Sequence, residues 1–156
     1  MTTSGPSPTP GSQKKPTTST PSWTKPRPAD IINYRYLWAR EAARGIEEGA
    51  KARPCLVLSV DETPSGTVIF TTALTTSDHT GANSIALPDA VKEHLGLDSS
   101  SRVIVTEYNR FVWVGPDIEP LHDGRIHLGT MPSKIARQVL SALLANRGAT
   151  QVKRES

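Results

Sequence analysis

Arg53 stands where a charged, glycine-containing segment meets an apolar run of strand length. Residues 45–52 read Gly-Ile-Glu-Glu-Gly-Ala-Lys-Ala, and residues 54–60 read Pro-Cys-Leu-Val-Leu-Ser-Val. Because Pro54 and the predicted strand fix the backbone of Arg53, its guanidinium is suited to bind a phosphate in a forked geometry. The alternative is a surface ion pair with Glu47 or Glu48. On the residues alone, both interpretations stay open.

Neither a metal centre nor a nucleotide phosphate loop is expected. The four histidines share no zinc-ligand spacing with the single cysteine, Cys55, and no His-Glu-x-x-His or Cys-x-x-Cys occurs. The 11 glycines form neither Gly-x-Gly-x-x-Gly nor the P-loop pattern. Cys55 lies inside the apolar run and is expected to be a buried structural thiol. We therefore expect chemistry by side chains, without a metal or a cofactor.

The distribution of charge along the chain says more than its sum. The chain has 156 residues, which suits one domain, and its 18 Lys and Arg against 15 Asp and Glu give a formal charge of +3. Four of these basic residues and no acid lie in residues 1–28, which leaves 14 basic against 15 acidic residues elsewhere. Any phosphate site in the folded part must therefore be built from a few convergent groups.

Composition also divides the chain into a tail and a domain. Residues 1–28 are rich in Thr, Ser, Pro, Gly and Lys, with Trp23 as the only large apolar side chain, which predicts a disordered tail. Residues 29–148 are expected to form the domain, and residues 149–156 a flexible C-terminal tail. No stretch approaches the roughly 18 apolar residues of a membrane span, and no secretory segment is visible. We therefore expect a soluble, cytoplasmic protein that does not contact membranes.

Short strands dominate the predicted domain, and a C-terminal helix closes it. Pro64 and Ser65-Gly66 predict a hairpin turn, and the polar residues 75–83 predict a loop at a strand end. A brief helix is expected between Pro88 and Gly96, and a longer one over residues 132–147. Strand patterns cover residues 32–36, 54–60, 67–74, 84–87, 102–107 with a continuation at 110–114, and 126–128. This pattern predicts a mostly β fold, a small and strongly bent barrel with short helices.

Three segments, in this order, resemble the PemK/MazF family of toxins. They are Asp30-Ile31-Ile32, Arg53-Pro54-Cys55-Leu56-Val57-Leu58-Ser59 and Ala73-Leu74-Thr75-Thr76-Ser77. That family has a Gly-Asp-Ile strand, a loop with Gly and Glu, an Arg-Pro-x-x-Val-Leu-Ser strand, and an apolar strand ending in a Pro-x-Thr segment. The resemblance covers about residues 29–115. Ala29 replaces the family's glycine, and Ala73 stands where proline is common.

The resemblance implies an SH3-like barrel, a homodimer, metal-independent and sequence-selective cleavage of single-stranded RNA, and neutralisation by an antitoxin protein. By position, Arg53 matches the catalytic arginine and Thr75 the catalytic threonine. The acidic residue is Glu48 if its spacing to the arginine is kept and Glu47 if its spacing to the glycine is kept; we take Glu48. The residues expected to bind RNA around them are Lys51, Thr76, Ser77 and His79.

Metal-free cleavage would use the 2′-hydroxyl of the RNA as nucleophile and create a phosphorane with added negative charge. Arg53 is suited to meet that charge, Thr75 to bind a phosphate oxygen, and Glu48 to orient Arg53 or take the 2′-proton. Glu107 and Arg110 are expected to form a structural pair, with lining of the RNA groove as the alternative. Two other functions stay open: a non-catalytic SH3-like binding module, and a toxin of the same fold that poisons DNA gyrase.

Overall fold

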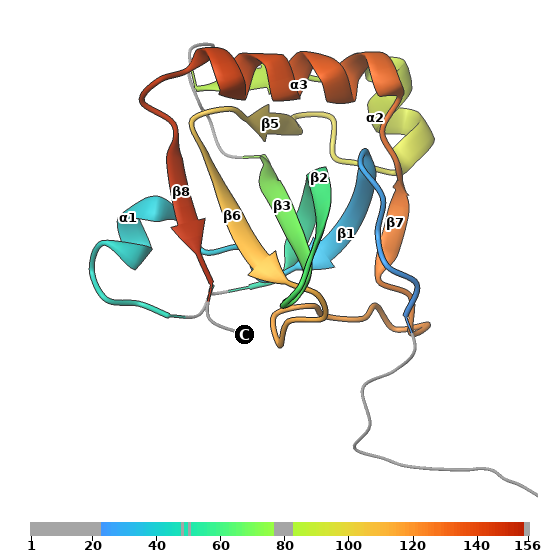
Figure 1. The fold of residues 1–156 in the computed structure, drawn as a ribbon. Helices are drawn as coiled ribbons and strands as arrows, with labels where there is room; N and C mark the ends of the chain where they lie inside the picture. The colour runs from blue at the N-terminus through green and yellow to red at the C-terminus, as the bar shows by residue number, and fades with distance from the viewer. Residues whose placement is uncertain (1–22, 48, 50, 77–82, 155–156) are drawn as a thin grey trace, which may run out of the picture.

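The computed structural model describes residues 23–154, except residues 48, 50 and 77–82. This part of the chain is a mostly β structure with short helices (Figure 1). Its elements in chain order are β1 (Asp30–Tyr34), α1 (Ala39–Ala42), β2 (Arg53–Thr63), β3 (Gly66–Thr75), β4 (Ser84–Ala86), α2 (Asp89–Leu95), β5 (Arg102–Ile104), β6 (Glu107–Val112), β7 (His127–Thr130), α3 (Ser133–Ala145) and β8 (Thr150–Lys153).

Strand β3 is the centre of an open, eight-stranded sheet. One edge of β3 pairs along β2, and the other edge pairs with β6 over its first half and with β5 at its end. The predicted single strand at residues 102–107 is therefore broken in two. The Thr72 hydroxyl lies at this break, 2.9 Å from the Ile104 carbonyl oxygen and 3.1 Å from that of Glu107. Among the residues that the structure describes, the strand pairs are antiparallel except β6–β8.

A β-bulge changes the register inside the β2–β3 hairpin. Near the turn, Thr63 lies opposite Gly66 and Ser59 opposite Phe70, but beyond the shift Val57 lies opposite Thr71 and Cys55 opposite Ala73. The bulge inserts one extra residue on β2, so every pair beyond it moves by one position. This shift decides which residues of the two strands face each other at the far end of the hairpin.

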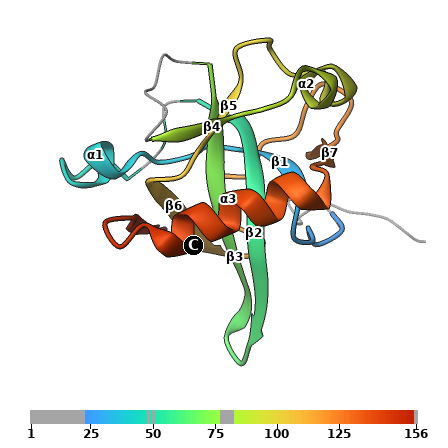
Figure 2. The same ribbon diagram turned by 90° about the horizontal axis from the view of Figure 1, so that it is seen from above.

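Both faces of the sheet are buried. One face carries a cluster that includes Tyr34, Cys55, Ile69 and Phe111, and the Tyr34 and Phe111 rings stack with centroids 4.7 Å apart. The other face carries Leu56, Leu74, Val103 and Met131, and α3 covers it with Val139 and Leu143. Figure 2 shows α3 crossing β2 and β3, with the tip of their hairpin extending past the helix.

The predicted class, mostly β with short helices including a C-terminal one, is confirmed. Helix α2 lies between Pro88 and Gly96, and Gly96 has the left-handed φ of 66° that favours glycine at this position. Helix α3 begins after Pro132 and ends before Arg147, as its apolar spacing predicts.

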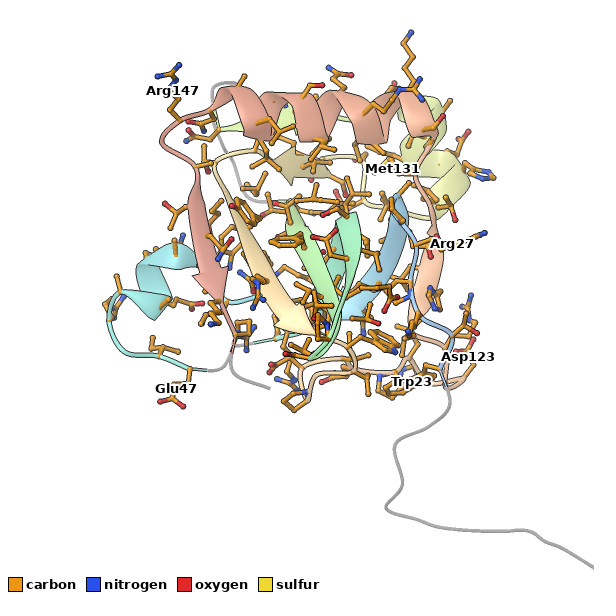
Figure 3. All side chains as sticks on the ribbon, in the orientation of Figure 1. Trp23, Arg27, Glu47, Asp123, Met131 and Arg147 are labelled. Carbon is orange, nitrogen blue, oxygen red and sulfur yellow. The ribbon has the colours of Figure 1, made fainter. Side chains whose placement is uncertain are left out.

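Two segments predicted to be tails contribute to the fold. Residues 149–156 were predicted to be flexible, but residues 150–153 form β8, whose Val152 is buried, because the strand pairs with β6 in a parallel register. At the other end, Trp23 packs against the core face that α3 does not cover, within a segment predicted to be a disordered tail. Figure 3 labels Trp23 on the side of the strands away from α3.

Candidate active site at Arg53 and Thr75

Arg53 and Thr75 lie on the same face of the β2–β3 hairpin, at the end farthest from its turn. Cys55 lies opposite Ala73, and two residues farther along each strand the same register reaches Arg53 and Thr75. Side chains alternate between the faces of a strand, so both share the face of Cys55 and Ala73. The Thr75 side chain is buried, with the residue 3% exposed. The two predicted catalytic residues are therefore brought together.

The Arg53 guanidinium is held against an aromatic ring. Its Cζ lies 5.2 Å from the centroid of the Trp38 ring, at a distance typical of a cation–π contact. Its Nε is buried, and no residue in the described part of the chain accepts a hydrogen bond from it. A buried donor without an acceptor costs about 1–3 kcal/mol, so an acceptor that reached this N–H would bind favourably. An anionic oxygen is the acceptor that a guanidinium binds best.

The Trp38 ring contacts the cationic groups of the site. It is 8% exposed and packs edge-on against Tyr36, with ring centroids 5.0 Å apart at 69°. Arg40 also contacts it, with Cζ 5.3 Å from the ring centroid. The backbone around it is fixed because the Ala39 N–H donates to Glu107 Oε1 at 2.8 Å and the Trp38 N–H to Glu41 at 3.2 Å.

Glu107 places a half-buried carboxylate beside this cluster. Its Oε1 also accepts from the Tyr36 hydroxyl at 3.2 Å. Burial raises the pKa of Glu107 above its usual value, against the lowering effect of the Ala39 and Tyr36 hydrogen bonds and of the Arg40 charge. Burial also raises the pKa of Tyr36 well above its usual value, so Tyr36 acts as a hydrogen-bond donor and not as an acid. A carboxylate with a raised pKa is a better proton acceptor than an exposed one.

The remaining predicted site residues divide into two groups. Lys51 and Thr76 are exposed and lie two residues before Arg53 and one after Thr75, so both are placed where a ligand at the hairpin end can contact them. Glu48, Ser77 and His79 lie outside the described residues. The exposed Glu47 side chain points away from the protein body in Figure 3, and its carbonyl oxygen accepts from Arg154.

One expectation about a neighbouring residue needs correction, and two site residues were missed. Glu107 was predicted to pair with Arg110, but it instead bonds Tyr36 and Ala39. The reason is that Glu107 and Arg110 lie three residues apart on β6, so their side chains point to opposite faces of the strand. Trp38 and Arg40 were not predicted as site residues. The sequence offered a hint in the aromatic alternation Tyr34, Tyr36, Trp38, which brings all three rings to one side.

Cys55 is a buried structural thiol, as its apolar surroundings predict. It is fully buried, and burial raises the pKa of its thiol far above the usual range. Within the described residues, no group of three or more His, Cys, Asp or Glu side chains is placed to hold a metal ion. No helix in the same residues is both long and apolar enough to cross a membrane.

Comparisons with known proteins add no information on the site. No family model, no curated protein and no solved structure matches the chain.

Proposed function

We propose that the chain is a toxin of the PemK/MazF type, with an SH3-like barrel, that cleaves single-stranded RNA without a metal ion. One observation carries this function. Arg53 and Thr75 lie together at the end of the hairpin, and the buried Nε of Arg53 has no acceptor in the described part of the chain. A phosphodiester would supply that acceptor.

The reaction needs one nucleophile, one proton acceptor and a group that meets the charge of the transition state. The 2′-oxygen of the RNA attacks the adjacent phosphorus, the bond to the 5′-oxygen breaks, and a 2′,3′-cyclic phosphate and a 5′-hydroxyl form. Arg53 donates to the phosphorane oxygens, and Thr75 binds a non-bridging oxygen. Because the 2′-proton must leave and the 5′-oxygen must gain one, a general base and a proton source complete the balance.

Two carboxylates are candidates for the general base. Glu48 is implied by the resemblance alone. Glu107 is supported by its place beside Trp38 and by burial, which raises its pKa and so favours proton uptake. Glu107→Gln keeps the acceptor oxygen for Ala39 and Tyr36 but cannot take a proton, whereas Glu48→Gln tests the other candidate. The variant that loses cleavage while it still binds RNA identifies the base.

The function is tested with purified protein and single-stranded RNA in EDTA. We expect cleavage, with the cyclic phosphate and 5′-hydroxyl products identified by mass spectrometry. Arg53→Gln and Thr75→Val should each lower kcat by about 100-fold, the loss typical of one transition-state donor, while exposed Arg44→Gln serves as the matched control. Cleavage that requires magnesium, or a folded Arg53→Gln protein with full activity, would contradict the mechanism. Binding without cleavage would favour a non-catalytic module.

The proposed partners are a second copy of the chain and an antitoxin protein. Both rest on the resemblance, as does action in the cytoplasm, where messenger RNA is the substrate. Sedimentation of the purified protein at micromolar concentration should give the mass of a dimer. Expression of the chain alone in bacteria should stop growth, and Arg53→Gln should restore it.

A further inference from the structure

One indole ring contacts two guanidinium groups at the candidate active site. The Cζ atoms of Arg53 and Arg40 lie 5.2 Å and 5.3 Å from the centroid of the Trp38 ring. Because both distances end at the same point, the two Cζ atoms are separated by at most their sum, about 10.5 Å. The spacing of two neighbouring phosphates of one RNA strand falls within that limit.

The two arginines differ in access and in what they contact. Arg53 is half-buried at the start of β2, whereas Arg40 is exposed on α1. No carboxylate in the described part of the chain lies within 4.0 Å of the Arg40 guanidinium; Glu107 acts on it only from a longer distance. Stacking on an indole uses the face of a guanidinium and leaves its N–H groups available in the plane. Arg40 therefore contacts the ring and keeps N–H groups available to bind an anion.

We infer that Arg40, stacked on Trp38, binds the RNA phosphate that neighbours the scissile one. This inference rests on the proposed function and adds a second phosphate position to the one at Arg53. Arg40 acts in binding, because its side chain is exposed on α1 and the cleaved phosphate belongs to Arg53. Its ligand is a phosphodiester, so the contact is independent of base sequence and sensitive to salt.

Arg44 provides a matched control for Arg40. It is an exposed arginine just beyond the end of α1, and it has no ring contact or ion pair within the described chain. Neutralising either residue changes the net charge of the same segment equally. A general electrostatic effect would therefore appear in both variants, and a specific phosphate contact only in Arg40→Gln.

The experiment separates binding from cleavage. Binding of a fluorescein-labelled 2′-O-methyl RNA, which lacks the nucleophile, is followed by anisotropy between 50 and 300 mM salt. We expect Arg40→Gln to raise Kd about threefold or more at low salt and to reduce the slope of log K against log salt by about 0.7, the value for one phosphate of a single strand. Arg40→Lys should keep the slope. On cleavable RNA, Arg40→Gln should raise KM and leave kcat unchanged, as expected for loss of uniform binding.

The outcomes distinguish failure of the Arg40 inference from failure of the proposed function. If the Arg40→Gln and Arg44→Gln titrations coincide, or if Arg40→Gln lowers kcat instead of raising KM, the inference is wrong even though wild-type protein binds and cuts RNA. If wild-type protein neither binds nor cuts RNA, the proposed function fails and the inference fails with it. Both residues are exposed, so we expect both variants to be folded. Unfolding in urea checks this.

Discussion

Arg154 forms a buried salt bridge with Asp117, with Nη2 3.0 Å from Oδ2, and so fastens the end of β8 to the segment between β6 and β7. The same guanidinium donates to four further acceptors, and Arg154 is 5% exposed. These acceptors are the Tyr34 hydroxyl (3.1 Å), the Arg35 carbonyl (2.8 Å), the Asn109 side-chain oxygen (3.3 Å) and the Glu47 carbonyl (3.2 Å). One side chain therefore joins β8 to β1, to β6 and to the segment that leads to Arg53.

Replacing Arg154 by methionine should destabilise the protein by about 3–5 kcal/mol, because the Asp117 carboxylate and the other acceptors lose a buried partner. The measurement is urea unfolding at neutral pH. Arg147→Met removes an exposed arginine just after α3 and is the control, with an expected change under about 0.5 kcal/mol. Equal stability of the two variants would show that the buried network contributes nothing.

The segment before β1 should also stabilise the domain. Trp23 packs against the core, Pro26 is buried, and the Thr24 carbonyl oxygen lies 3.0 Å from His127 Nε2. A protein that begins at Ala29 should therefore unfold at lower urea than one that begins at Trp23. Trp23→Ala alone should cost about 1–2 kcal/mol, less than a fully buried tryptophan because the ring is half-buried. Identical midpoints would mean that the ring adds no stability.

The hairpin that carries Arg53 and Thr75 could be predicted from sequence, but its register could not. The turn residues near Pro64 and the apolar runs on either side fix the pairing of two strands. Without the bulge, the pairing of Thr63 with Gly66 would extend to Arg53 opposite Thr76. No hydrophobic pattern in the sequence marks the extra residue near Leu58. Thr75 was predicted from the order of motifs that resembles the family. Strand periodicity alone would not have paired it with Arg53.

Elements held by distant contacts were missed for the same reason. Strand β8 is Thr-Gln-Val-Lys, with one apolar residue, and it forms because Arg154 and the edge of β6 hold it. Trp23 lies among Thr, Ser and Pro, a composition typical of a tail. Ala29 has a φ of 81°, which no alternation pattern indicates, although glycine stands at this place in the family it resembles. Such features depend on the whole fold and not on neighbours in sequence.

Glu107 should make stability depend on pH in one direction. Its folded pKa is raised by burial, so between the unfolded and folded pKa values the native state binds more protons than the unfolded state. Stability therefore falls as pH rises through that window, and the cost is fully present above the folded pKa. Glu107→Gln should gain stability relative to wild type on going from pH 4 to pH 7.

The measurement for Glu107 is urea unfolding of the variant and wild type at pH 4, 5, 6 and 7. Glu93→Gln, which changes an exposed carboxyl on α2, is the control and should show no comparable trend. A Glu107→Gln protein that lost stability relative to wild type as the pH rose would mean that the carboxylate is favoured in the fold. In that case burial would not dominate at this position.

Gly49→Ala should disturb the segment that delivers Arg53 to the site. A Cβ at Gly49 would lie closer than van der Waals contact to the Tyr36 carbonyl oxygen and 2.9 Å from the Arg35 carbonyl oxygen. Both atoms are backbone, so no side chain can turn away and the segment itself must shift. Overpacking of this kind costs about 1–3 kcal/mol. Tyr36 lies two residues before Trp38, and Gly49 lies four residues before Arg53. A shift between Tyr36 and Gly49 should therefore also separate the Arg53 guanidinium from the Trp38 ring.

Gly148→Ala is the matched control, because its Cβ would meet only the Asn146 side-chain oxygen at an ordinary 3.5 Å. We expect Gly49→Ala to lower kcat on RNA at least about tenfold, since a displacement of about 1 Å can cost 100-fold, and Gly148→Ala to leave it unchanged. Tryptophan fluorescence and urea unfolding report whether the variant stays folded. A folded Gly49→Ala protein with wild-type kcat would show that the close approach of Gly49 to Tyr36 has no part in placing Arg53.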